Sequence, residues 1–309
     1  MPQCVPRARA LAASALAAGA LLTGCVSGGA SVDRLGTVPD DVAADLVVTL
    51  QQARLDYADR VVEIEVVNSS DTDLVLLGGE LESDSFGPST ETEARPFRAE
   101  TLAVGGRRGV YVELGEATCP TDPAEDAVAG SGTRAAVTVA LGSRADHGAP
   151  TTVEVPISDP GGHLARNFAR DCAAAAVASG VTLTQTDAVR TERRRDGTVA
   201  VITLLAEPVD DGPDVRITRI DGSTLIDPAD GAAWTGRALE GQDDGVLELA
   251  LVPARCDHHA VSEDKRGTFL PVHAEVNGAA QRVVYVPMPD DAKRDLFEYI
   301  ADHCGWPEG

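Results

Sequence analysis

The stretch GVYVELGEATC, residues 109–119, has a counterpart in GVLELALVPARC, residues 245–256, once a single one-residue gap is allowed. In both stretches apolar and polar side chains alternate, which is typical of a β-strand with one buried face. Each stretch ends in a cysteine, Cys119 or Cys256. The chain is therefore predicted to contain the same structural unit twice.

The likeness continues toward the end of each unit. Residues 152–160 (TVEVPISDP) match residues 282–290 (RVVYVPMPD) in pattern, and both lead into a short helical stretch. In each stretch two apolar residues precede a cysteine at spacings of four: Leu164, Phe168 and Cys172 in the first unit, and Leu296, Ile300 and Cys304 in the second. This spacing places the three side chains on one helical face, which predicts a helix packed against the sheet.

Four cysteines lie within the two units, and three connectivities are open to them. The repeat favours one of these, in which Cys119 pairs with Cys172 and Cys256 pairs with Cys304. In the chain-entropy model, closing a loop of about fifty residues stabilises each unit by roughly 4 kcal/mol.

Strand-like runs extend the repeat over two units of about 125 residues each. The first unit holds runs near 46–51, 61–67, 73–81, 97–104, 109–115, 134–141 and 151–156. The second holds runs near 181–190, 198–206, 214–220, 233–239, 245–252, 269–276 and 282–287. The pattern predicts an all-β fold with a tandem repeat of two immunoglobulin-like or fibronectin-III-like β-sandwich domains, each with a short C-terminal helix and one internal disulfide. A small barrel would give much the same pattern.

These runs assign residues 46–173 to the first domain and 181–306 to the second. The segment between them, near 173–180 (AAAAVASG), is short and apolar. It is interpreted as a linker that leaves the two domains packed against each other.

The N-terminus has the features of an export signal. Arg7 and Arg9 precede an apolar run, residues 10–22, that is too short to span a bilayer. Leu22-Thr23-Gly24-Cys25 resembles the lipobox of bacterial lipoproteins in all four positions. The resemblance implies that residues 1–24 are a cleaved signal peptide and that Cys25 carries lipid at the extracytoplasmic face of the cell membrane. An ordinary secretory peptide with an accidental cysteine is the alternative. Residues 25–45 are expected to form the lipidated cysteine and a flexible tether.

The composition excludes some classes of partner. With 49 acidic against 26 basic residues, the formal charge is -23, which opposes nucleic-acid binding. Lys265 and Lys293 are the two lysines in the sequence, and the dominance of Arg and Ala favours a high-GC Gram-positive host.

A search for catalytic and cofactor motifs is negative. The sequence contains no G-x-S-x-G elbow, no H-E-x-x-H pair, no phosphate-binding glycine loop and no C-x-x-C motif. We therefore expect a non-catalytic binding or interaction module that recognises an envelope protein, a polymer or a small ligand. A hydrolase with a dispersed site is a further alternative.

Residues 255–267 (RCDHHAVSEDKRG) differ most from their counterpart in the first unit. Candidate binding residues in this loop are Arg255, Asp257, His258, His259, Glu263 and Asp264. Imidazole and carboxylate ligands favour Zn or Cu, with His258 and His259 as the leading ligands and His273 or His303 nearby. Against a closed site, adjacent histidines on an extended strand point to opposite faces. The simpler interpretation is a charged loop held by local ion pairs.

The same loop resembles a segment, R-C-D-x-H-A-x-x-E-D-K-x-G-T, of uncharacterised secreted proteins of high-GC Gram-positive bacteria. The resemblance covers residues 255–268 and implies no activity.

Other candidates are weaker. His147 and His163 are expected in polar loops, without partners at the sequence spacing of metal ligands. Trp234 and Trp306 are interpreted as packing residues, and the Asp-rich segments 210–214 and 227–230 as hairpin turns and not calcium sites.

Overall fold

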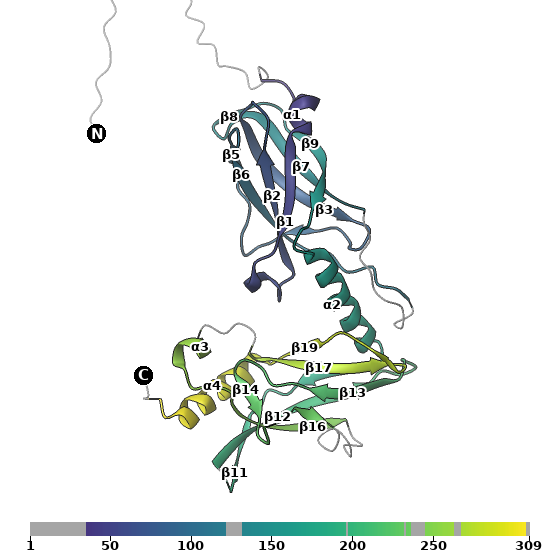
Figure 1. The fold of residues 1–309 in the computed structure, drawn as a ribbon, viewed down its shortest axis with the longest axis vertical. Coiled ribbons are helices and arrows are strands. Elements are labelled where there is room, and N and C mark those ends of the chain that lie inside the picture. Colours follow the sequence, from purple (N-terminus) through teal and green to yellow (C-terminus); the bar gives the residue numbers. More distant parts are fainter. Residues whose placement is uncertain are drawn as a thin grey trace, which may run out of the picture.

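The computed structural model describes residues 35–121, 132–195, 197–231, 233–235, 245–262 and 267–306. The predicted signal peptide and Cys25 lie outside the described residues, as do Glu263, Asp264 and the end of the strand expected at 233–239. Figure 1 shows two β-domains placed one beyond the other, with helix α2 between them.

Domain 1 is built from two layers of strands. The first layer has the order β4 (Thr90–Glu91), β6 (Arg107–Glu113), β2 (Val61–Asn68), β1 (Leu46–Gln51). The second has the order β9 (Thr151–Ser158), β7 (Thr133–Ser143), β3 (Leu74–Ser83), β5 (Glu100–Leu102), and β8 (Asp146–His147) pairs with β7. A short parallel pairing between β1 and β9 joins the two layers along one side.

Domain 2 repeats this order in two separate sheets. The first has the order β14 (Ile226–Pro228), β16 (Val246–Pro253), β12 (Gly197–Pro208), β10 (Val181–Gln185), and β11 (Arg190–Arg194) pairs with β12. The second has β19 (Val284–Pro287), β17 (Phe269–Val276), β13 (Val215–Ile220), β15 (Trp234–Thr235), and β18 (Ala279–Ala280) pairs with β17. Strands β10 and β19, which belong to different sheets, are connected by a side-chain hydrogen bond. Gln185 Nε2 donates to the Val286 carbonyl at 2.8 Å.

The strand orders of the two domains match position by position. In both, the first, second and sixth major strands share one layer, and the third, seventh and last share the other. This is the layer arrangement of an immunoglobulin-like sandwich. The prediction of an all-β tandem repeat is confirmed, and domain 2 is a sandwich and not a barrel.

Both predicted disulfides are present. Cys119 is bonded to Cys172, with a sequence separation of 53, and Cys256 is bonded to Cys304, with a separation of 48. Each bond ties the segment after β6 or β16 to the helix that ends its domain, α2 (His163–Ala178) or α4 (Asp290–Cys304). Two stable disulfides are typical of a protein that folds in an oxidising compartment.

The segment expected to be an interdomain linker, near 173–180, is mostly part of helix α2. Residues 173–178 continue the helix, because alanine is the strongest helix former and nothing in AAAAVA interrupts the backbone hydrogen bonds. At its start, Leu164 and Phe168 pack in the core of domain 1. Near its end, Val177 packs with Val181 and with Val276 of domain 2. One helix therefore contributes to the hydrophobic packing of both domains.

The expected tether is also shorter than its predicted range of residues 25–45. Helix α1 (Asp40–Ala44) lies against domain 1, and Val38 and Val42 are buried in its core. The Val38 amide donates to Thr151 Oγ1 at 3.2 Å. These apolar side chains hold residues 38–44 on the sheet in place of a flexible connection.

Candidate functional site

Helix α2 begins beside the turn that follows the 3₁₀ helix η2 (Arg54–Asp56) of domain 1. The carboxylate of Asp159 accepts hydrogen bonds from the amides of His163 and Leu164, each at 2.9 Å, and so satisfies the first turn of α2. Arg166, one turn further on, donates from Nη2 to the Tyr57 hydroxyl at 2.8 Å. This contact fixes the start of α2 against the turn.

Arg166 makes further contacts to neutral groups. Its Nη2 lies 2.9 Å from His163 Nδ1, and its Nη1 donates to the Gly161 carbonyl. Its guanidinium carbon lies 5.8 Å from the centre of the Tyr57 ring. Among the described residues, no carboxylate forms an ion pair with Arg166, so its orientation is fixed while its charge is not neutralised.

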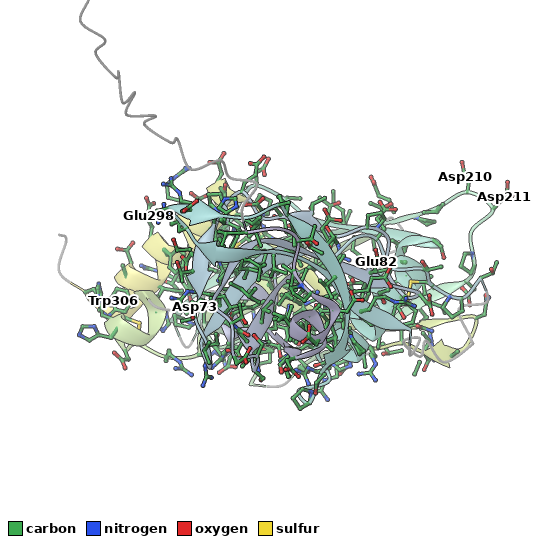
Figure 2. The ribbon with its side chains drawn as sticks, turned by 90° about the horizontal axis from the view of Figure 1, so that it is seen from above. Asp73, Glu82, Asp210, Asp211, Glu298 and Trp306 are labelled. Atoms are coloured by element: carbon green, nitrogen blue, oxygen red, sulfur yellow. A yellow bond between two sulfur atoms is a disulfide. The ribbon has the colours of Figure 1, made fainter. Side chains whose placement is uncertain are left out.

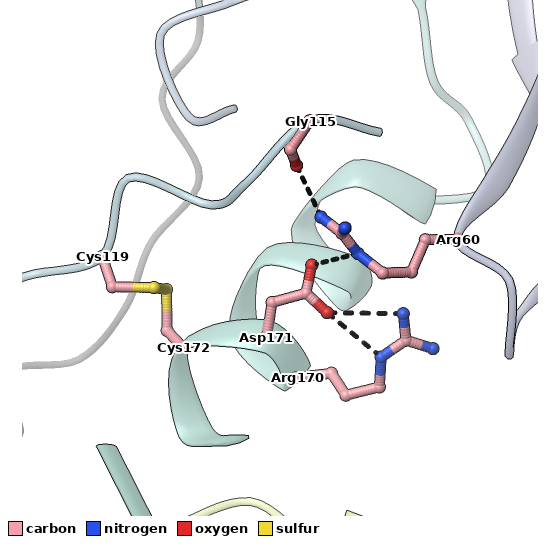
Figure 3. Close-up of a disulfide and its surroundings, with 6 residues drawn as sticks. All are labelled: Arg60, Gly115, Cys119, Arg170, Asp171 and Cys172. Atoms are coloured by element: carbon pink, nitrogen blue, oxygen red, sulfur yellow. Dashed lines mark hydrogen bonds and ion pairs between the residues drawn. A yellow bond between two sulfur atoms is a disulfide. The ribbon is translucent and has the colours of Figure 1, made fainter. Parts of the chain in front are cut away.

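Arg170, one further turn along α2, is also held against Tyr57. Its Nη1 donates to the Tyr57 carbonyl at 2.5 Å and its Nη2 to Asn167 Oδ1 at 2.9 Å. The Asp171 carboxylate lies 3.4 Å from Arg170 and 2.9 Å from Arg60, so it is shared between two arginines (Figure 3). Asp171 therefore neutralises only part of the charge of this pair.

Arg60 connects the turn to the disulfide region. Its backbone has a φ of 58°, in the left-handed region that residues with a Cβ rarely adopt. Its Nη2 donates to the Gly115 carbonyl at 2.5 Å, close to the Cys119–Cys172 bond (Figure 3). The side-chain contacts of Arg60 offset the cost of this backbone conformation.

Domain 2 approaches the same helix with the segment between β18 and β19. Gln281, Arg282 and Val283 lie on this segment, and Tyr285 lies on β19. Together with α2 and the turn they line a cavity of about 610 Å³ that is open to solvent. Its lining residues are Tyr57, Arg166, Asn167, Arg170, Gln281, Arg282, Val283 and Tyr285. A volume of this size falls within the range of small-molecule sites.

The charge of the cavity is opposite to that of the chain. Three arginines line it, and the described lining residues include no carboxylate. Arg282 is exposed, and among the described residues no carboxylate lies within ion-pair distance of it. A chain with a formal charge of -23 therefore has a cationic pocket at the junction of its domains.

Two arginines of α2 have acidic residues at the equivalent positions of α4. His163, Arg166 and Arg170 lie nine, six and two positions before Cys172, and the residues at the same offsets before Cys304 are Asp295, Glu298 and Asp302. The fold of the repeated unit therefore does not require basic residues there. This charge reversal between the two repeats is the sequence signal that could have identified the pocket.

His163 differs from its sequence prediction. The sequence predicts a polar loop there, whereas His163 is the first residue of α2, is buried, and contacts Arg166 and Tyr57. Burial lowers the pKa of His163, and the nearby Arg166 charge acts in the same direction, against an opposing effect of Asp159. The neutral ring is therefore favoured, which allows its Nδ1 to accept from Arg166.

A second cavity, of about 1100 Å³, lies near η2 and includes Phe269 of domain 2. Its charged side chains are of both signs, and Arg95 pairs with Asp56 at 2.5 Å while lying 4.0 Å from the centre of the Tyr111 ring. Because Arg95 already has a buried carboxylate and an aromatic partner, the second cavity has less unpaired positive charge available to a ligand.

The 255–267 loop, the leading candidate from the sequence, is described only in part. His258 and His259 lie on a short helix, α3 (His258–Ser262), and not on the extended strand assumed for them. Their rings are 6.2 Å apart and nearly perpendicular, and His258 lies 4.9 Å from the Trp306 ring. The Asp257 carboxylate accepts from the His259 amide at 3.1 Å, which is a local backbone contact.

Among the described residues, no three His, Cys, Asp or Glu side chains form a group that could hold a metal ion. His273 lies on β17 and contacts Asp221 at 2.7 Å, and His303 lies 3.2 Å from the Tyr299 hydroxyl. The structure thus gives both histidines partners other than His258 and His259. Zn or Cu binding by the loop stays a prediction, since Glu263 and Asp264 lie outside the described residues.

The tryptophans, the Asp-rich turn and His147, which are also candidates from the sequence, lie apart from the cavity lining described above. Trp234 is buried and donates to the Ala250 carbonyl at 3.2 Å, and Trp306 donates to the Cys256 carbonyl at 3.2 Å. Asp210 and Asp211 lie at a projecting turn between β12 and β13 (Figure 2), where Asp211 has a φ of 59°. His147 lies on β8 beside the Gly148 carbonyl.

Comparison with known proteins gives only distant similarity. No protein-family model and no curated protein matches the chain. Invasin, a bacterial integrin-binding protein, is similar over 79% of this chain at 12% identity with a TM-score of 0.20, and the chain spans only 39% of invasin. The sporulation control protein of Bacillus subtilis is similar over 84% of this chain and 96% of its own length, at 12% identity and a TM-score of 0.17. An exo-chitosanase of Amycolatopsis orientalis is similar over 77% of this chain and 26% of its own, at 11% identity and a TM-score of 0.17.

Proposed function

We propose that the chain is a membrane-anchored extracytoplasmic lipoprotein that acts as a non-catalytic binding module, with the cavity between its two domains as the binding site. The observation that carries the proposal is the sharing of α2 by both domains. Leu164 and Phe168 belong to one core, and Val177 packs with residues of the other domain. A continuous helix of this kind holds the two sides of the cavity at a fixed separation.

The kinds of residue in the cavity support binding without catalysis. The described lining consists of arginine, tyrosine, asparagine, glutamine and valine side chains. These groups orient and hold a ligand, whereas nucleophilic and acid–base catalysis mostly uses serine, cysteine, histidine or carboxylates. A hydrolytic constellation is thus not present among the described residues that line this cavity.

The anchor is supported by the lipobox resemblance at Cys25 and by the disulfides, which fit an oxidising compartment. In the part of the chain that the structure describes, no helix is long and apolar enough to cross a membrane. We expect Cys25→Ser to move the protein from the membrane fraction to the soluble fraction. Retention of Cys25→Ser in the membrane fraction would contradict the anchor.

Binding is tested by capture from envelope extracts of the host with the membrane-extracted chain. Three forms are compared: wild type, Arg282→Glu in the cavity, and Arg144→Glu. Arg144 is exposed in domain 1 outside the described cavity lining and, among the described residues, has no carboxylate partner, so it is a matched charge control. We expect the wild type and Arg144→Glu to retain the same envelope component and Arg282→Glu to lose it. Equal recovery by all three forms, or recovery of nothing, would overturn the proposal.

A further inference from the structure

We infer that the interdomain cavity recognises a small organic anion: a carboxylate or phosphate group attached to a ring of about monosaccharide size. This inference rests on the proposed binding function and adds the chemistry of the ligand. It depends on the guanidinium groups of Arg166, Arg170 and Arg282, on the two tyrosines, and on the charge reversal between the repeats.

The first argument is the orientation of Arg166. Its guanidinium is held by the Tyr57 hydroxyl, His163 Nδ1 and the Gly161 carbonyl, and none of these contacts is to a carboxylate. A guanidinium has five N–H donors, of which the contacts to Tyr57, His163 and Gly161 use three in Arg166, and the remaining N–H groups together with the positive charge favour a carboxylate or phosphate oxygen. Because protein contacts already fix the side chain, less conformational entropy is lost when an anion binds.

The second argument is the contribution of the other domain. Arg282 reaches the cavity from the segment before β19, more than a hundred positions along the chain from Arg166. No described carboxylate forms an ion pair with it. Cationic side chains from two domains thus line one space without an acidic side chain in its described lining, and an anion would relieve their repulsion.

The third argument is the shape and the aromatic content of the cavity. Tyr57 and Tyr285 lie among its lining residues, and 42% of Tyr285 is exposed. Aromatic side chains present an apolar body next to a polar tip, which suits a ring that carries hydroxyl groups. A volume of about 610 Å³ is within the range of small-molecule sites and holds a ring with its substituents.

The fourth argument is the comparison within the chain. Asp295, Glu298 and Asp302 occupy in α4 the positions that His163, Arg166 and Arg170 occupy in α2. Both helices end a sandwich of the same strand order and carry the same disulfide. A helix at this place in the sandwich therefore does not itself require basic residues. In α2, Arg166 and Arg170 hold the helix against the turn at Tyr57 and also bring positive charge to the cavity, which a negative group would complement.

The test is calorimetric titration of the membrane-extracted chain with four probes: glucose 6-phosphate, glucuronate, methyl glucoside and inorganic phosphate. We expect at least one of the two sugar anions to bind, methyl glucoside not to bind, and inorganic phosphate to bind more weakly because it lacks the ring. Comparison of the two sugar anions distinguishes a phosphate ligand from a carboxylate ligand. Rising salt should weaken the binding, since the attraction is between charges.

The variants connect this binding to the cavity. Arg282→Gln is expected to weaken sugar-anion binding about tenfold, the loss typical of one charged contact, and the control Arg144→Gln to leave it unchanged. Equal binding by Arg282→Gln and Arg144→Gln would overturn the site, and failure of both sugar anions to bind would overturn the ligand class. If an envelope component is still captured in a cavity-dependent manner while both sugar anions fail, the binding function stands and only the anion assignment is wrong.

Discussion

Helices α2 and α4 occupy the same place in two copies of one fold, yet they contact different surroundings. Helix α4 packs within its own domain, where Leu296 and Ile300 are fully buried and the Tyr299 hydroxyl donates to the Thr198 carbonyl at 3.0 Å. Helix α2 belongs to one core through Phe168 and to the packing of the next domain through Val177. The difference shows that the shared fold fixes the position of the helix, while the residues on its outer face determine which parts of the protein it contacts.

The first way to test this comparison is to remove each disulfide. Cys119→Ser with Cys172→Ser, and separately Cys256→Ser with Cys304→Ser, should each lower the free energy of unfolding by roughly 4 kcal/mol in denaturant titrations, because each loop is about fifty residues long. Only the first pair holds the helix that carries Arg166 and Arg170. We expect sugar-anion binding to weaken in the first variant and to persist in the second. Weaker sugar-anion binding in the second variant than in the first would contradict the separate roles of the two helices.

The second test is to break the packing between the domains. Val177 is buried among apolar side chains of domain 2, so Val177→Asp would place a charge there without a partner. We expect a loss of about 3 kcal/mol in the coupling between domains. Calorimetry should then resolve two transitions in place of a joint one, and small-angle scattering should show a longer particle. Val104→Asp, at an exposed valine, serves as the control and should leave both measurements unchanged.

The third test separates the side chain of Arg60 from its backbone. Arg60→Ala loses the contacts to Asp171 and Gly115 while keeping a Cβ at a φ of 58°, and should destabilise the protein by about 2 kcal/mol. Arg60→Gly loses the same contacts but removes the backbone strain, so it should cost about 1 kcal/mol less. Chemical denaturation measures both. Equal losses would mean that the left-handed conformation is not costly at this position.

The smallest expected effect is a dependence of stability on pH. Because burial lowers the pKa of His163 in the folded protein, the unfolded chain binds the proton more readily. The stability should be complete above the ordinary histidine pKa of about 6.5 and should fall as the pH decreases through that value toward the folded pKa. Thermal melting of wild type and His163→Gln between about pH 7.5 and about pH 5, the range in which histidine titrates, should show a weaker decline in the variant. If stability declined equally in wild type and His163→Gln, the pH dependence would arise from groups other than His163.

The sequence predicted the strands well because alternation with a period of two marks half-buried strands directly. The run expected at 46–51 coincides with β1, and the run at 269–276 with β17. The disulfides followed from the repeat, since equivalent cysteines in equivalent units have equivalent partners. The short strands β4, β8, β14 and β18 lie outside the predicted runs because two or three residues carry no periodic pattern.

Two features were misjudged for a physical reason. The alanine-rich segment 173–178 was interpreted as a linker, although alanine favours a helix and the preceding face was already helical. The cavity was missed because its residues come from the turn at Tyr57, from α2 and from the segment at Arg282. Only the fold brings these segments together. The 255–267 loop was selected from its composition alone, and composition does not tell whether candidate side chains lie close together in the folded protein.

The most direct test of the account is a two-dimensional ¹⁵N NMR titration of the chain with the stronger of the two sugar anions, recorded with detection of arginine side chains. The account predicts saturable shifts at the Arg166, Arg170 and Arg282 guanidinium groups and none at the amides of α4 around Glu298. Shifts confined to other parts of the chain, or the absence of any saturable shift at these three arginines, would contradict it.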